Sequence, residues 1–212
     1  MGDIRESYLV AATSAVALLR DPAVAAAWDK PSALTEFSVG GLAGHLAHQL
    51  VRVGQVLPEH PQQGEPVSLL HHYTNSPWVQ AGLDHESNIG IRKSGESVSA
   101  EGAAALGQRA GELLDEQLRG LPAQAADRVI FLPPSGWSLS LDDFLLTRVM
   151  EIVVHSDDLA ASVGTSTPTL PAFVIDPVVD LLARLAVHRH GATAVIRTLS
   201  RAERAPATIS AF

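Results

Sequence analysis

The strongest constraint on the fold is the helical spacing of the apolar residues over four long segments. In the longest segment, 140–164, apolar side chains recur every three to five residues for about six helical turns. The segments 4–28, 38–57 and 99–120 share this spacing, and a proline in the first of them predicts a kink or a break. Helices of this kind bury their apolar faces against one another. The sequence therefore predicts an all-α four-helix bundle with short additional helices at the C-terminal end.

Residues that start and stop helices mark the ends of these segments. Serine at a start predicts an N-cap, because its side chain accepts a hydrogen bond from an unpaired backbone N–H of the first turn. Proline and glycine mark the stops, since proline cannot continue a helix and glycine adopts the conformation that closes one. The predicted caps are Ser38, Ser99 and Ser140, and the predicted stops are Pro58, Gly120 and Gly164.

The remaining segments are less regular. Residues 58–98 are rich in proline and glycine, which predicts loops with one or two short helices. A short extended segment is predicted over 128–132, and two further helices are predicted over 176–190 and 192–201. Long irregular segments in compact domains often carry function, which makes 58–98 a candidate functional segment.

Charge and composition argue against several classes of protein. Acidic residues outnumber basic residues 23 to 15, and the basic residues form no run, which argues against binding to nucleic acid or to an anionic membrane. The chain has no cysteine, so a thiol nucleophile of its own and a cysteine-based zinc finger are excluded. It shows no secretory signal and no uninterrupted apolar stretch of about 20 residues. We expect a folded, cytoplasmic protein.

Glu151 and His155 are the first candidates for chemistry. They stand four residues apart in the longest helix, so their side chains share one face. Zinc binds imidazole nitrogen and carboxylate oxygen, and a catalytic zinc site has three protein ligands and one open position. His45, midway along the second predicted helix, is the best candidate for the third ligand. The alternative is structural: Glu151 pairs with Arg148, and both histidines are ordinary core or rim residues.

Two further polar residues extend this face. Arg148 and Asp158 join Glu151 and His155 in a polar stripe on a helix whose other faces are apolar. Such a stripe is costly inside a bundle unless a ligand satisfies it, whereas a stripe that faces solvent needs no ligand. In a catalytic site, Asp158 would accept a hydrogen bond from a ligand imidazole or from a thiol, and Arg148 would bind a substrate carboxylate. Otherwise Asp158 is an exposed acid, and Arg148 forms an ion pair on its own helix.

Four other residues are candidates for contacts with a cofactor or substrate. His48 and Arg52 follow His45 on nearly the same helical face, and His48 is also a possible substitute ligand. Trp78 lies in the irregular segment, where a pocket wall could form, and Trp137 stands just before the longest helix. Each residue also has a simpler interpretation as a surface, loop or packing residue.

Two segments around these residues resemble a known family. The sequences FSVGGLAGHLA over 37–47 and RVMEIVVHSDDL over 148–159 resemble the N-terminal metal-binding domain of mycothiol-dependent maleylpyruvate isomerases. That domain belongs to the DinB-like superfamily of four-helix-bundle metalloenzymes. The resemblance implies a DinB-like metal-binding bundle over 1–170, with a short helical extension over 171–212 packed on the bundle.

The resemblance also implies an enzyme that uses a metal and a small thiol. In the family, the positions of His45, Glu151 and His155 hold a divalent metal, usually zinc, and mycothiol supplies the thiol. The pKa of a free thiol is about 8.5, and coordination to zinc converts the thiol to a thiolate. We therefore expect an S-transferase or isomerase that acts on a small electrophilic metabolite through a metal-bound thiolate, as a monomer or a homodimer.

Two other functions fit the same residues. A metal-dependent hydrolase would use the same site with bound water as the nucleophile, and it would need no thiol. A helical bundle that serves only as a binding or dimerisation module would need neither chemistry nor thiol, and replacing the three ligands would leave its stability unchanged. Metal content and the omission of thiol from an assay discriminate among these functions.

Overall fold

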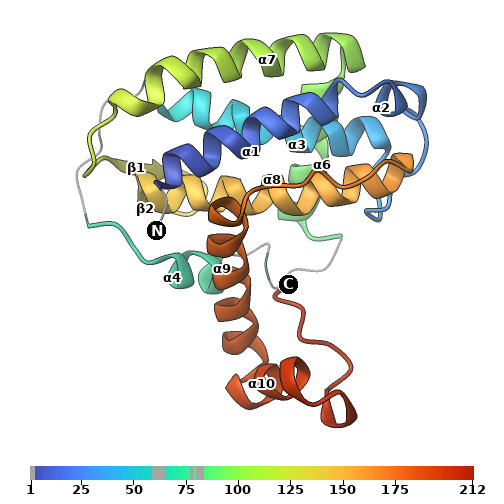
Figure 1. Cartoon of the computed structure of the whole chain (residues 1–212). Helices are drawn as coiled ribbons and strands as arrows, with labels where there is room; N and C mark the ends of the chain where they lie inside the picture. The colour runs from blue at the N-terminus through green and yellow to red at the C-terminus, as the bar shows by residue number, and fades with distance from the viewer. Residues whose placement is uncertain (1–2, 59–64, 77–78, 80–83) are drawn as a thin grey trace.

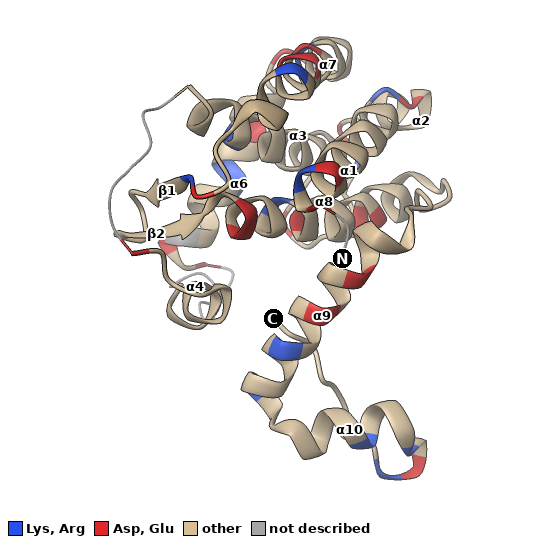
Figure 2. Cartoon of the chain, turned by 60° about the vertical axis from the view of Figure 1, so that its left-hand side comes forward, with Lys and Arg blue, Asp and Glu red and all other residues tan. Residues whose placement is uncertain are grey.

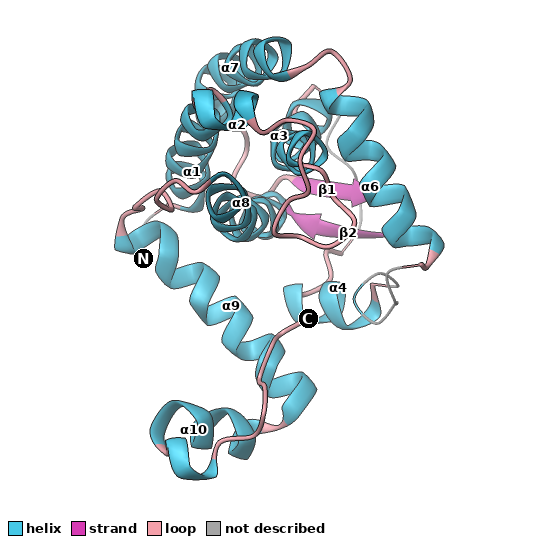
Figure 3. Cartoon of the chain, turned by 90° about the vertical axis from the view of Figure 1, so that its right-hand side faces the viewer, coloured by secondary structure: helices cyan, strands magenta, loops and turns pink. Residues whose placement is uncertain are grey.

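Four long helices form the centre of the molecule (Figure 1). The computed structural model describes residues 3–58, 65–76, 79 and 84–212. The bundle consists of α1 (Ile4–Leu19), α3 (Val39–Val56), α7 (Ala103–Gly120) and α8 (Leu141–Val163). Figure 3 shows α3 and α8 nearly end-on, side by side, with α1 and α7 alongside them. The predicted all-α four-helix bundle is confirmed.

The bundle core is built from the side chains that the helical spacing singled out. Leu42 and Leu46 on α3 and Leu145 and Ile152 on α8 are all fully buried. Each such side chain stabilises the fold by about 1.5–3 kcal/mol relative to its exposed state. The packing of these buried side chains against one another holds α3 and α8 side by side. This pair of helices carries the candidate site.

Most predicted helix ends are confirmed. Ser38 and Ser140 cap α3 and α8, and their Oγ atoms accept hydrogen bonds from the backbone N–H three residues on, at 2.9 and 3.0 Å. Gly164 closes α8 with a left-handed backbone (φ 71°), which glycine adopts without strain. The predicted cap at Ser99 is wrong, because Ser99 is the last residue of another helix and α7 begins after Gly102.

The first predicted helix, over 4–28, is two helices. After α1 ends at Leu19, α2 (Pro22–Ala26) starts with Asp21 as its N-cap. Pro22 occupies the first helical position, where its missing N–H costs no hydrogen bond. The break therefore lies at the proline that predicted a kink or a break.

The segment 58–98 contains a helix longer than predicted. α4 (Leu69–Asn75) is one of the expected short helices, but α6 (Glu86–Ser99) has 14 residues and lies along α3. Its Gly95 packs so closely on α3 that a Cβ added at Gly44 would collide with the backbone oxygen of Gly95. The sequence of α6 is poor in strong helix formers, so this packing, rather than local propensity, accounts for the helix.

A β-hairpin precedes α8. The predicted extended segment is β1 (Val129–Leu132), but it has a partner that was not predicted, β2 (Trp137–Ser140). The strands are antiparallel, with Val129 opposite Ser140. β2 leads directly into α8, and its first residue, Trp137, contacts the rings of His71 and His72 on α4. A 3₁₀ helix, η1 (Leu121–Ala123), follows α7 on the way to the hairpin.

Helix α9 (Ala172–His190) projects from the bundle and carries α10 (Ala192–Ser200) at its far end, followed by η2 (Ala202–Arg204) (Figure 1). It begins four residues before the predicted start, so Pro177 lies inside the helix. A proline there leaves the carbonyl of Phe173 without its helical partner, and Ser7 Oγ donates to that oxygen at 3.1 Å. Among the described residues, no helix has the length and hydropathy to cross a membrane.

Candidate metal centre

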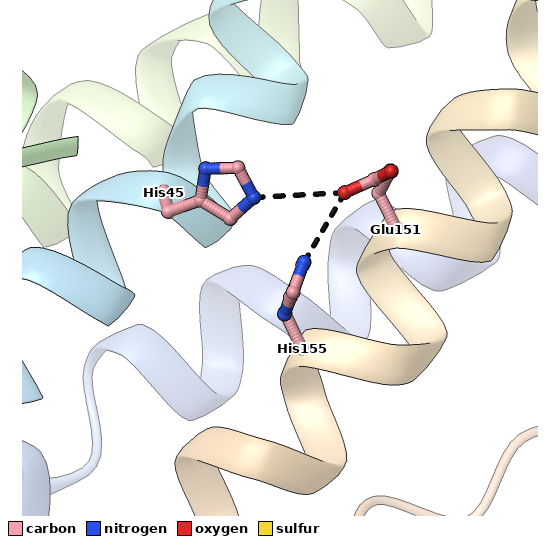
Figure 4. A group of neighbouring side chains, drawn as sticks. All are labelled: His45, Glu151 and His155. Carbon is pink, nitrogen blue, oxygen red and sulfur yellow. Dashed lines mark hydrogen bonds and ion pairs between the residues drawn. The ribbon is translucent and has the colours of Figure 1, made fainter. Parts of the chain in front are cut away.

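His45, Glu151 and His155 meet between α3 and α8 (Figure 4). His45 extends from the middle of α3, whereas Glu151 and His155 stand one turn apart on α8 and point toward it. Their possible ligand atoms all lie within 4.8 Å of one another. The structure thus brings together the three residues that the sequence proposed as metal ligands.

The separations fit a single metal ion. Glu151 Oε2 lies 3.1 Å from His155 Nε2 and 3.5 Å from His45 Nε2. Zinc bonds of about 2.0–2.2 Å place neighbouring ligand atoms of a tetrahedron about 3.3–3.6 Å apart. Small rotamer changes that adjust the distances between these ligand atoms would therefore be enough for the three residues to bind an ion. Two imidazoles and one carboxylate also form a donor set of catalytic zinc sites, which keep one position open.

Asp158 fixes the orientation of the His155 ring. Its Oδ2 lies 3.0 Å from His155 Nδ1, so Nδ1 carries the proton and donates it to the carboxylate. The other ring nitrogen, Nε2, then faces Glu151. A carboxylate that holds the far nitrogen of a histidine is the usual partner of a metal-binding imidazole, because it sets the tautomer and raises the basicity of the ligand.

The three residues differ in protonation in the metal-free protein. Burial lowers the pKa of His45, which keeps its imidazole neutral. Burial raises the pKa of Glu151, but hydrogen bonds from His155 and His45 outweigh burial and hold that pKa well below its usual range. Burial lowers the pKa of His155, but hydrogen bonds to Asp158 and Glu151 outweigh it and raise the pKa to about 9. A cation that binds here must therefore displace one proton, from His155.

Arg148 lies one turn before Glu151 and connects to His45 through a side-chain bridge. Its Nη1 donates to Gln49 Oε1 at 2.6 Å, and Gln49 Nε2 donates to the backbone oxygen of His45 at 2.9 Å. Its guanidinium lies over the ring of Phe144, 5.6 Å from the centroid. No carboxylate among the described residues lies within 4.0 Å of Arg148, so the alternative of an ion pair on α8 is wrong.

The cluster is shielded but remains reachable from solvent. The side chains of His45, Glu151 and His155 are 11%, 15% and 15% exposed. Helix α6 covers the α3 side, where a Cβ added at Gly95 would lie 2.7 Å from the backbone oxygen of Gly41. Only glycine permits this close approach, which places the α6 backbone beside the turn of α3 that carries His45.

The other candidates on α3 lie outside the cluster. His48 is half-buried one turn after His45, and its buried Nδ1 has no hydrogen-bond partner among the described residues. Burial, with the nearby charge of Arg52, lowers the pKa of His48 to about 4. Arg52 is half-buried one turn further along α3. Their contact with a thiol or substrate stays a prediction.

Trp137 has a partner that the sequence analysis did not assign. Its Nε1 donates to Nδ1 of His72 at 3.1 Å, which leaves the proton of the neutral imidazole on Nε2. His72 is buried on α4, and burial lowers its pKa to about 4. The only sequence signal for His72 was its place beside His71. The structure shows that His72 is the buried member of this pair and His71 the exposed one. Trp78, the other aromatic candidate, lies outside the described residues.

Gln49 was missed as part of the site. It is buried and stands four residues after His45 on the same face of α3, where it connects the guanidinium of Arg148 to the backbone that carries the ligand. The spacing of four was visible in the sequence. The partner on α8 was not, because only the packing of the two helices brings Arg148 to it.

A family model of the mycothiol maleylpyruvate isomerase N-terminal domain matches residues 9–160. The chain belongs to this family. The searches of curated proteins and of solved structures found no match. Membership of the mycothiol maleylpyruvate isomerase N-terminal domain family confirms the resemblance seen in the sequence and agrees with the all-α, DinB-like bundle of the structure.

The matched range of the mycothiol maleylpyruvate isomerase N-terminal domain includes all three residues of the cluster. It ends within α8, so α9 and α10 lie outside it. The name of the family links the chain to mycothiol, and the clustered histidines and carboxylate form a group within the described part of the matched range that could hold a metal.

Proposed function

We propose that the chain is a cytoplasmic, metal-dependent enzyme that uses mycothiol in an S-transfer or isomerisation of a small electrophilic metabolite. The observation that carries the proposal is the convergence of His45 Nε2, His155 Nε2 and Glu151 Oε2 from two helices. These donors suit zinc, and the family supports mycothiol as the thiol.

Each residue of the cluster has a distinct role in this proposal. His45, Glu151 and His155 would hold the ion, and Asp158 would keep His155 Nε2 directed at it. A divalent metal held by these residues would supply acidification of a bound thiol, so that a thiolate would be available at neutral pH. Because the chain has no cysteine, the nucleophilic sulfur comes from the co-substrate.

Arg148 would bind the electrophile. Its guanidinium is positioned by Gln49 and by the Phe144 ring, and no described carboxylate lies within 4.0 Å of it, so it suits a carboxylate of the substrate. Sulfur would form a bond to the electrophilic carbon of that substrate, and the displaced electron pair would leave with a leaving group or take up a proton. His48, Arg52, Trp78 and Trp137 are the proposed contacts for the rest of the thiol and substrate.

Elemental analysis of the purified protein tests the metal site. We expect about one equivalent of metal in the wild type and little in His45→Ala, because the site loses one of its three ligands. His188→Ala is the matched control, since His188 is exposed on α9, and it should keep the metal. Equal metal in His45→Ala and the wild type would remove His45 from the site. A wild type that binds no zinc would contradict the proposal.

A thiol-omission assay tests the reaction class. Zinc-loaded protein is incubated with small epoxides and activated alkenes that carry a carboxylate, with and without mycothiol. We expect consumption of thiol and electrophile only when both are present. Turnover without thiol would instead indicate a hydrolase, in which water is the nucleophile.

A further inference from the structure

The charges of the chain are divided between two parts of the molecule. Residues 181–212 contain five arginines and one acidic residue, whereas residues 1–180 contain ten basic and 22 acidic residues. In Figure 2 the half of α9 near the bundle carries red bands, whereas the far half of α9 and the region of α10 carry blue bands and, after α10, a red one. The part that projects from the bundle is thus positive, although the whole chain has a net charge of −8.

The positive part also exposes large apolar side chains. Ile196 and Leu199 stand three residues apart on α10 and are 62% and 76% exposed, whereas Val195 is buried. Arg197 lies between these two residues in the sequence and Arg201 follows them, and the described residues offer neither arginine a carboxylate within 4.0 Å. We call these four exposed residues the arm tip. Apolar side chains ringed by charge are typical of a protein contact surface.

A groove on the bundle has the complementary character. It lies between the start of α1 and the end of α7, has a volume of about 440 Å³, and has Leu9, Val10 and Leu118 in its wall. Leu118 is 45% exposed. Asp3, Arg5 and Glu6 also line it. The Arg5 guanidinium forms an ion pair with Asp142 and donates to the backbone oxygens of Gln124 and Ala125. Neither Asp3 nor Glu6 is within 4.0 Å of a basic side chain in the described part of the chain, so the lining keeps an acidic excess. We call this the α1/α7 groove.

We propose that the arm tip of one copy docks in the α1/α7 groove of a second copy. The tip does not reach its own groove, because α9 carries it away from the bundle on the side opposite α7 (Figure 1). Two copies can exchange arms reciprocally, which uses both surfaces of both copies and closes with two-fold symmetry, the commonest arrangement of homodimers. Ile196 and Leu199 meet the apolar wall, and the tip arginines face Asp3 and Glu6.

The occupant is a second copy because the chain itself supplies both complementary surfaces. The arm tip needs an acidic surface with an apolar hollow, and the bundle of the same protein offers one. Opposite charges on the two surfaces also steer association and set the orientation. The dimer goes beyond the proposed function, because neither surface contains a residue of the metal cluster, and metal content does not depend on it.

Sedimentation velocity on the full chain tests the dimer. We expect the wild type to sediment as a dimer at micromolar concentration and low salt, and to dissociate as salt screens the charges. Ile196→Glu in the tip and Leu118→Glu in the groove should each weaken the dimer by more than about tenfold. Val179→Glu is the matched control, because Val179 is 55% exposed on α9 outside the tip, and it should stay dimeric. Circular dichroism and metal content confirm that each variant is folded.

A charge exchange between the two surfaces gives a sharper test. Glu6→Arg and Arg197→Glu should each weaken the homodimer. When the two variants are mixed, one contact pairs Arg at position 6 with Glu at position 197 and the other contact is wild type, so the heterodimer should regain wild-type affinity.

Three results would overturn the proposal. The first is a wild type that stays monomeric at the highest soluble concentration. The second is a dimer that Ile196→Glu and Leu118→Glu leave intact, or a mixture of the charge variants that fails to recover. The third is a monomer that sediments with anionic vesicles and loses this binding in Ile196→Glu, which would assign the tip to a lipid surface.

Discussion

Helix α8 has an apolar face and a polar face, and burial has opposite effects on the stability of the fold at the two. Leu145 and Ile152 are fully buried in the core, where the transfer of apolar surface from water stabilises the fold. Glu151 and His155 lie on the same helix but are charged in the metal-free protein, and burial of charge is costly unless the charges are paired. One face of α8 therefore holds the bundle together, while another face keeps a cluster of polar side chains arranged for a ligand.

Leu145→Ala has the largest expected effect, and it tests whether the apolar face can be weakened without a loss of zinc binding at the polar face. It should lower the free energy of unfolding by about 2–5 kcal/mol, because a fully buried side chain is truncated. Added zinc should stabilise the wild type and Leu145→Ala equally, and should not stabilise His45→Ala. Chemical denaturation with and without zinc measures both quantities. Leu70→Ala, exposed on α4, is the control and should change stability by about 0.5 kcal/mol or less. Loss of zinc stabilisation in Leu145→Ala would show that the two faces are not separable.

Asp158→Asn tests the polar face at a residue that is hydrogen-bonded to a proposed ligand, His155. We expect zinc affinity to fall about 10–100-fold, because the carboxylate that orients His155 is lost. Competition with a chromophoric chelator measures the affinity. Asp157→Asn is the matched control, since Asp157 is exposed and accepts a hydrogen bond from Thr167 instead. Equal losses in the two variants would mean that Asp158 has no orienting role.

The pH dependence of zinc binding gives the smallest expected effect per step, at most about tenfold for each pH unit. His155 has a pKa of about 9 in the metal-free protein and about 6.5 when unfolded, so its contribution to stability is complete below pH 6.5 and is lost as the pH rises through 9. Zinc must displace the same proton, so its affinity should rise with pH by up to about tenfold per unit and level off above pH 9. Isothermal titration calorimetry from pH 6.5 to 9 measures this slope. A flat profile would show that His155 binds no ion.

The sequence predicted the parts of the fold that local signals determine. Both ends of α8 are marked by residues that act within one turn, Ser140 and Gly164, and both predictions are confirmed. The long helix α6 was not predicted, because it depends on the contact of Gly95 with α3, which no local pattern reveals. The early start of α9 has the same origin, since Ser7 on α1 satisfies the carbonyl that Pro177 leaves free.

In the candidate site, too, the features that lie within one helix could be predicted, and those that depend on helix packing could not. Glu151 and His155 could be paired from their spacing on one helix, and the structure places them 3.1 Å apart. That His45 faces these two residues could be predicted only with the additional expectation that its helix packs beside theirs. The bridge from Gln49 to Arg148 could not be predicted, because it joins two helices through side-chain rotamers that only the packed structure determines.

X-ray absorption spectroscopy at the zinc edge, with and without mycothiol, is the most direct test of the proposed site. Without thiol we expect only nitrogen and oxygen ligands at about 2.0–2.2 Å, from the two histidines, the glutamate and solvent. With saturating mycothiol, one sulfur should join them at about 2.3 Å. A nitrogen and oxygen shell that mycothiol leaves unchanged would contradict a thiol-binding metal centre between α3 and α8.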